Sequence, residues 1–296
     1  MGAFIGQERA TGNLELIVDD ELEALIRTAL LEDLRYGPDI TTIATVPADT
    51  VAEAKIVSRQ HGVVAGLPVV RAVFDTVIGP DNYVVTEQAE DGSVVEPGSV
   101  AMALRAPATS LLTAERTALN LLCHLSGIAT ATAEWVTAVE GTGAQIRDSR
   151  KTLPGLRALQ KYAVRAGGGV NHRMGLGDAA LIKDNHVVAA GGVAAALEAV
   201  RAAAPDIPVE VEVDSLEQLD EVLALKPALV LLDNFEPWAT QMAVQRRDNS
   251  APDTKLESSG GLRLDVAADY ARTGVDYLAV GALTHSVTVV DFGLDM

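Results

Sequence analysis

The stretch VEVEVD at residues 209–214 decides the fold, because its strict alternation places three acidic side chains on one face of a short strand. Five other short β-rich runs end in a polar, charged or small residue and precede a helical stretch. They are AQIRD (144–148), AALIK (179–183), ALVLLD (228–233), LESS (256–259) and YLAVG (277–281). This repetition predicts βα units that form a parallel sheet.

The acidic face also bears on the choice between two parallel-sheet architectures. A strand buried on both faces of an open sheet should be apolar throughout, whereas a barrel strand can carry polar residues toward an active site at its C-terminal end. Six units are fewer than the eight of a complete barrel. We therefore expect an α/β protein with an incomplete (β/α) barrel of about six to seven units, and a doubly wound open sheet remains the alternative.

The N-terminal part of the chain has a different pattern. Apolar residues at mixed spacings of three and four predict a helix over residues 14–34. Short runs punctuated by Gly, Pro and Asp over residues 51–107 predict an antiparallel sheet with some helix, and hence a small α+β domain. A long helix follows over residues 113–140, with Thr113 as its predicted N-cap. One polar stripe of this helix carries Arg116, Asn120 and His124.

The charge distribution limits the classes of partner. The chain has 23 Lys and Arg against 41 Asp and Glu, a net charge of −18, so nucleic acid and anionic lipid would be repelled. Against this background, residues 147–183 hold eight basic and two acidic residues, a net of +6. A single cysteine, Cys123, fits a reducing compartment, and no apolar run is long enough to span a membrane. We expect a cytoplasmic enzyme that binds a strongly anionic small molecule.

Residues that follow the predicted strands should meet at one mouth, because the carboxyl ends of parallel strands share an edge. Small residues after the last two strands would let backbone N–H groups approach a phosphate, although two ordinary glycine turns would look the same. The candidates are Arg150, Lys151, Lys183, Glu212, Asp214, Asp233, Asn234, Ser259, Gly260, Gly261, Gly281 and Ala282, with His285 as a further donor.

Several of these charged residues have a structural interpretation beside the functional one. Arg157, Lys161 and Arg165 are spaced by four, and we interpret them as a solvated helix stripe. Arg173 and its neighbour His172 lie in a glycine-rich loop, where dense cations favour anion binding. The two carboxylates Glu212 and Asp233 could bind Mg²⁺ or sugar hydroxyls, stabilise a developing cation, or simply pair with Lys183.

The longer motifs resemble the quinolinate phosphoribosyltransferase family over most of the chain. The strings that carry the resemblance are DITT (39–42), ERTALNLLCHLSGIAT (115–130), DSRKTLPGLRALQKYAVRAGGGVNHRMGLGDAALIKDNH (148–186), VEVEVDSLEQL (209–219), LLDNF (231–235), LESSGGL (256–262) and YLAVGALTHS (277–286). The resemblance implies transfer of phosphoribosyl from phosphoribosyl pyrophosphate to quinolinate, with loss of pyrophosphate and CO2, in NAD biosynthesis. It also implies an open-sandwich domain over residues 13–127, joined by 286–296, and a barrel over 128–285. Residues 1–12 are expected to be disordered.

The resemblance further implies a role for each matching residue. Quinolinate would be held by Arg116, Arg150, His172, Arg173 and Lys183, and Lys151 would face the pyrophosphate. Glu212 and Asp233 would engage the ribose hydroxyls and Mg²⁺, and the catalytic set would be Lys151, Lys183, Glu212 and Asp233. The 5′-phosphate would lie among Ser259, Gly260, Gly261, Val280, Gly281, Ala282 and His285. Ser149 stands where the family usually has threonine. Family members are homodimers or multiples of dimers, so Arg116 would act in the partner's site.

Three rival functions stay open on the sequence alone. A related transferase could take nicotinate without decarboxylation, although a monocarboxylate needs fewer cations. Lys183 could be the Schiff-base lysine of an aldolase-type lyase. A non-catalytic binder of phosphorylated ligands is the third alternative.

Overall fold

The chain folds into two compact units, and each is described by itself. The computed structural model describes residue 14, residue 16 and residues 19–296, so the expectation for residues 1–12 lies outside the described part. The sandwich unit comprises the described residues up to 133 together with 153–168 and 286–296, and the barrel unit comprises 134–152 and 169–285. Residues 128–133 and 153–168 thus lie in the sandwich unit, whereas the division expected from the sequence (13–127 with 286–296, against 128–285) assigned them to the barrel.

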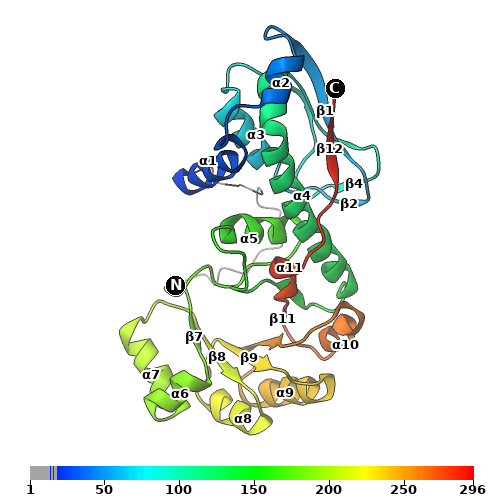
Figure 1. The fold of residues 1–296 in the computed structure, drawn as a ribbon. Helices are drawn as coiled ribbons and strands as arrows, with labels where there is room; N and C mark the ends of the chain where they lie inside the picture. Colours follow the sequence, from blue (N-terminus) through cyan, green and yellow to red (C-terminus); the bar gives the residue numbers. More distant parts are fainter. Residues whose placement is uncertain (1–13, 15, 17–18) are drawn as a thin grey trace. The chain divides into compact units, whose positions relative to one another are not determined.

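The sandwich unit is built on a four-stranded antiparallel sheet (Figure 1). Its strands, in spatial order, are β12 (Phe292–Asp295), β1 (Val51–Ser58), β5 (Val100–Pro107) and β3 (Val84–Gln88). A small second sheet pairs β2 (Gly62–Val63) with β4 (Val94–Val95). Burial alternates along the first part of β1, so one face of the sheet packs on the core.

Four helices precede or follow these strands: α1 (Asp20–Leu34), α2 (Ile40–Thr45), α3 (Leu67–Val77) and α4 (Ala108–Ala138). The first described helix begins later than predicted, because the side chain of Asp19 caps it by accepting the Leu22 N–H at 3.0 Å. The prediction that Thr113 is an N-cap is wrong. Helix α4 follows β5 directly, and the Thr113 hydroxyl donates to the carbonyl of Thr109 within the helix.

In helix α5 (Arg157–Ala166), the spacing of the basic residues does not predict how exposed they are. The prediction of a solvated stripe is wrong, because Lys161 is fully buried and neither Arg157 nor Arg165 is fully exposed. The helix is buried over most of its circumference. Tyr162 donates to Asp91 at 2.6 Å, and Gln160 lies 2.9 Å from the His124 ring and accepts the Leu153 N–H.

The barrel unit contains a sheet of six parallel strands, as predicted. Their spatial order is β6 (Gln145–Arg147), β11 (Tyr277–Ala279), β10 (Lys255–Ser259), β9 (Leu229–Asp233), β8 (Val209–Val213) and β7 (Ala180–Ile182). An isolated parallel bridge from Arg147 to Val170 extends the β6 edge. No pairing joins this edge to β7 among the described residues, which fits an incomplete barrel.

Helices connect consecutive strands of the barrel unit. From β7 onward the connecting helices are α6 (Asp184–Ala190), α7 (Val193–Ala203), α8 (Leu216–Ala224), α9 (Pro237–Ser250) and α10 (Ala267–Ala271), with a 3₁₀ turn at Leu264–Val266, and α11 (Ala282–His285) follows the last strand, β11. Strand β9 is buried along nearly its whole length, as expected where helices cover a parallel sheet. Strand β8 becomes less buried at Glu212, so its acidic face opens toward the C-terminal end.

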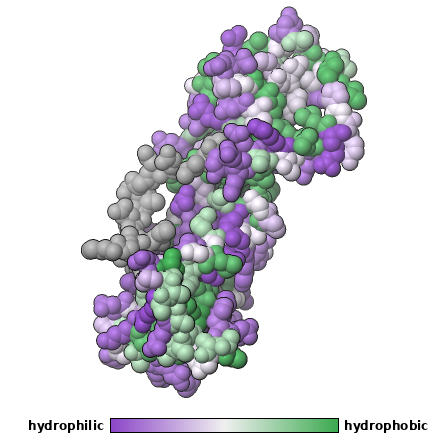
Figure 2. Space-filling model, turned by 90° about the vertical axis from the view of Figure 1, so that its left-hand side faces the viewer, coloured by the Kyte–Doolittle hydropathy of each residue, from purple (hydrophilic) through white to green (hydrophobic). Residues whose placement is uncertain are grey.

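Hydrophilic and hydrophobic residues are interspersed over the face drawn in Figure 2. In the described part of the chain, no single helix has the length and apolar character needed to cross a membrane. The pair α6 and α7 meets those criteria of length and composition only when taken together, and it is bent by 89°.

Candidate active site

A cavity of about 540 Å³ lies at the carboxyl ends of the barrel strands. Its lining contains fifteen of the sixteen residues predicted to bind substrates. These are Ser149, Arg150, Lys151, His172, Arg173, Lys183, Glu212, Asp233, Ser259, Gly260, Gly261, Val280, Gly281, Ala282 and His285. The exception is Arg116, which lies on α4 of the sandwich unit with 63% of its side chain exposed.

The two predicted carboxylates stand at the ends of neighbouring strands, β8 and β9. Glu212 forms an ion pair with the Lys183 ammonium, which begins the segment after β7. Asp233 instead accepts a hydrogen bond from the Asn234 amide at 2.8 Å. The alternative that these carboxylates simply pair with Lys183 therefore holds for Glu212 and not for Asp233. Both carboxylates line the cavity.

Gly260 has the backbone conformation that a close-packed turn requires. Its φ is +93°, and a Cβ at this position would lie 2.2 Å from Oδ1 of Asn234. Asn234 itself has a φ of +57°, and its N–H donates to the Ser259 carbonyl at 2.9 Å. The turns after β9 and β10 are thus locked together, so the backbone of the Ser259–Gly261 turn is held at the cavity wall.

Two hydrogen bonds from side chains hold the backbone of Lys151, a cationic residue of the loop after β6. The Ser149 hydroxyl accepts the Lys151 N–H at 3.1 Å, and the Thr284 hydroxyl donates to the Lys151 carbonyl at 2.8 Å. A Cβ at Gly281 would lie 3.0 Å from Cδ of Lys151, so the absence of a side chain there leaves room for the lysine. These contacts fix where Lys151 enters the cavity.

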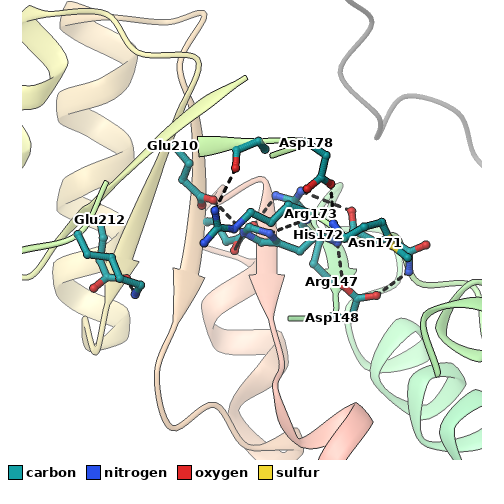
Figure 3. Close-up of polar contacts among 12 residues, drawn as sticks. Arg147, Asp148, Asn171, His172, Arg173, Asp178, Glu210 and Glu212 are labelled. Carbon is teal, nitrogen blue, oxygen red and sulfur yellow. Dashed lines mark hydrogen bonds and ion pairs between the residues drawn. The ribbon is translucent and has the colours of Figure 1, made fainter. Parts of the chain in front are cut away.

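A buried charged cluster lies beneath the cations, and of its members the sequence predicted only His172 as a site residue. It consists of Arg147, His172, Glu210 and Glu257 (Figure 3 labels the first three). Arg147 donates to Glu257 at 2.5 Å and lies 4.6 Å from the centre of the Tyr277 ring. The His172 Nε2 atom is 2.8 Å from Glu210 and 3.5 Å from Glu257. The sequence signal for this cluster was a charged residue, Glu257, inside the predicted strand LESS (256–259).

The pKa values of the two buried carboxyl groups reflect this position. Burial raises the pKa of Glu210 to about 7 and that of Glu257 to about 7, and the nearby Arg147 guanidinium opposes the rise in both. Burial is also the largest influence that lowers the pKa of Arg173. The cluster thus places desolvated charges of both signs directly beside the cavity.

The segment that carries His172 and Arg173 is itself held by acidic side chains. Asp148, which is fully buried, accepts the His172 N–H at 2.8 Å and the Asn171 amide at 2.5 Å. Asp178 accepts the backbone N–H groups of Met174 and Gly175 (Figure 3 shows both aspartates). The Arg173 guanidinium donates to the Ala179 carbonyl at 3.0 Å. The glycine-rich loop is therefore anchored at both ends rather than free.

Among the described residues, one group has the spacing of metal ligands, and it is His172, Glu210 and Glu257. The predicted pair, Glu212 and Asp233, does not belong to such a group. Two carboxylates alone make an incomplete ligand set for an ion held by protein atoms only.

Comparison with known proteins gives consistent matches across the chain. A family model described as the N-terminal domain of quinolinate phosphoribosyl transferase matches residues 39–126, and the corresponding C-terminal domain model matches residues 128–295. A nicotinate-nucleotide pyrophosphorylase [carboxylating] of Mycobacterium leprae is 64% identical, covering 95% of this chain and 100% of the relative. The Homo sapiens protein of that name is 36% identical, covering 97% and 95%.

A solved structure agrees with these sequence matches. The nicotinate-nucleotide pyrophosphorylase from Francisella tularensis superposes with a TM-score of 0.89 at 36% identity, and the match covers 96% of this chain and 99% of that chain. Sequence and fold therefore point to the same group of proteins over nearly the whole length.

Proposed function

Because the chain belongs to the quinolinate phosphoribosyltransferase family, we propose that it transfers phosphoribosyl from phosphoribosyl pyrophosphate to quinolinate and decarboxylates the product to nicotinate mononucleotide. The observation that carries the proposal is the composition of one cavity. It combines glycine turns suited to a phosphate, several cations suited to a dicarboxylate and a pyrophosphate, and two carboxylates between them.

The chemistry needs positioning and electrostatics more than a nucleophile. The bond between the ribose carbon and pyrophosphate breaks, and the electron pair leaves with pyrophosphate. Positive charge then develops on the sugar, where Glu212 and Asp233 can stabilise it while the ring nitrogen of quinolinate forms the new bond. The ribosylated ring is cationic, so it can accept the electron pair left by departing CO2, and that carbon then takes up a proton.

Magnesium fits this site as part of the substrate complex. Mg²⁺ keeps several waters and is usually held by one or two carboxylates together with substrate phosphates. Glu212 and Asp233 supply such carboxylates, and when bound the ion would offset the charge of the departing pyrophosphate. Lys151 lies in the same lining and would share that task.

An assay with purified protein tests the reaction directly. We expect quinolinate, phosphoribosyl pyrophosphate and Mg²⁺ to yield nicotinate mononucleotide and CO2 in equal amounts, with nicotinate a much poorer acceptor because it offers the cations only one carboxylate. Product can be followed by chromatography and CO2 by isotope release. Faster turnover of nicotinate, or ribosylation without CO2, would overturn the assignment. A borohydride-stable adduct on Lys183 would favour a lyase instead.

The exposed position of Arg116 supports a homodimer in which each subunit completes its partner's site. Arg116→Ala and Arg150→Ala should each be nearly inactive alone. Mixing them should restore up to about a quarter of wild-type activity, because half of randomly formed dimers would carry one intact site. Activity after subunit exchange is the measurement.

A matched control separates this outcome from simple subunit exchange. Arg150→Ala mixed with Asp233→Asn should show no recovery, because both residues line the cavity of one chain. Equal recovery in both mixtures, or none in either despite verified exchange, would contradict the role of Arg116 in the partner's site. We also propose a cytoplasmic location, to which one free cysteine is suited.

A further inference from the structure

Both ring nitrogens of His172 are engaged inside the barrel unit. Its Nδ1 atom accepts the N–H of Arg173 at 2.7 Å, and its Nε2 atom faces the Glu210 carboxylate at 2.8 Å. Only 9% of the His172 side chain is exposed, and only 5% of the Glu210 side chain. The ring therefore forms a bridge between a buried carboxylate and the backbone of the following arginine (Figure 3).

These contacts indicate which of the two ring nitrogens of His172 carries the proton. A nitrogen that accepts an N–H carries a lone pair, so Nδ1 is unprotonated and Nε2 carries the hydrogen in the neutral ring. That hydrogen lies between Glu210 and Glu257, where it meets acceptors. A protonated Nε2 cannot bind a metal ion, and Arg147 already supplies positive charge to Glu257. The metal-like spacing of this group thus has a sufficient explanation in hydrogen bonding.

The bridge ends on a residue of the cavity. Arg173 lines the cavity, and its guanidinium is held at a second point by the Ala179 carbonyl at 3.0 Å. If the imidazole ring rotated, the Arg173 N–H would lose its acceptor and the arginine would lose one of its two attachments. An arginine that binds a carboxylate in a fixed geometry depends on such support.

We propose that Glu210 is a positioning residue that acts through His172 on Arg173, and that His172 orients the arginine rather than donating a ring N–H to the substrate. The inference rests on the proposed function, since it concerns how the cavity binds a dicarboxylate. It assigns a task to a buried acid that does not line the cavity, and it gives His172 a different task from the one the family resemblance implies.

The ring proton can be observed in the free protein. With ¹⁵N-labelled histidine, five residues contribute signals, and the His172→Asn variant identifies that of His172. At neutral pH we expect His172 to show the neutral form protonated at Nε2, and Glu210→Leu to convert it to a mixture of tautomers. A doubly protonated ring, or one protonated at Nδ1, in the wild type would overturn the proposal. This result does not depend on turnover, so failure of the proposed reaction would be separately visible.

Kinetics then test the consequence for binding. Glu210→Leu removes the acceptor, and we expect the KM for quinolinate to rise about tenfold, with kcat changed by less than about threefold. Glu210→Gln keeps an acceptor oxygen and should restore a KM within about twofold of wild type. The KM for phosphoribosyl pyrophosphate should stay constant in both. A Glu210→Leu enzyme with an unchanged KM for quinolinate, or a Glu210→Gln enzyme as impaired as it, would overturn the proposal.

Discussion

Replacing Asp233 by asparagine is expected to lower kcat by about 10²-fold to 10³-fold, the loss seen when a preorganised electrostatic contact to a transition state is removed. Asp233 ends strand β9 at the cavity wall, where its carboxylate opposes positive charge that develops only as pyrophosphate departs. The asparagine keeps the shape and loses the charge. Because the charge acts mainly in the transition state, KM for quinolinate should change by less than roughly threefold. Steady-state kinetics at saturating phosphoribosyl pyrophosphate provide the measurement.

Asp214 offers a matched control for this substitution. It is an exposed aspartate one residue beyond the end of the neighbouring strand β8, and it does not line the cavity. Asp214→Asn should therefore leave kcat near the wild-type value. Equal losses in the two variants would mean that general surface charge, rather than a specific contact, accounts for the effect. A large rise in KM with unchanged kcat for Asp233→Asn would mean that Asp233 binds substrate and transition state equally.

The second large effect concerns stability. Arg147→Met should lower the free energy of unfolding by about 3–5 kcal/mol, because breaking a buried ion pair leaves an uncompensated charge in the interior. The Glu257 side chain is fully buried and that of Arg147 is 10% exposed, so the substitution leaves the carboxylate in the interior without its guanidinium partner. Denaturant titration at fixed protein concentration gives the change, provided that the slope m is unchanged.

Two further variants make the stability prediction specific. Adding Glu257→Gln to Arg147→Met should recover part of the loss, because the second change removes the unpaired charge. Lys255→Met lies on the same strand as Glu257 and breaks a more exposed pair with Asp276. Its cost should stay below about 1 kcal/mol. Similar losses for Arg147→Met and Lys255→Met would contradict the importance of burial.

Much of the barrel unit could be predicted from the sequence because each strand carries its own local signal. All six predicted strands are present, and Glu212 and Asp233 stand at strand ends as the alternation of VEVEVD and the terminal Asp of ALVLLD indicate. The carboxyl ends of parallel strands share one edge, so local patterns were enough to gather residues that are far apart in the chain.

The remaining features depend on tertiary contacts, which no local pattern contains. Lys161 has the spacing of a solvated stripe, yet it is buried in a helix whose Tyr162 and Gln160 bond to Asp91 and His124 of the sandwich unit. Thr113 has the character of an N-cap, but the helix begins earlier because β5 runs directly into it. Glu257 is one of three polar residues in LESS, and the sequence does not single it out. Its partner Arg147 lies on a strand far away in the chain, and only the fold brings the two together. In the proposed homodimer Arg116 would meet the substrate of the partner subunit, and this role stays a prediction.

The division of the chain between its two units limits where the protein can be cut into separate parts. The chain passes from one unit to the other after residues 133, 152, 168 and 285. A polypeptide that ended at residue 127 would lack helix α5 and the edge strand β12, and its complement would carry both as orphaned segments. Neither unit is therefore a consecutive piece of the gene. Recombination at residue 127 would divide the sandwich unit, and recombination at any point between residues 134 and 285 would divide both units, so the two units are expected to be inherited together.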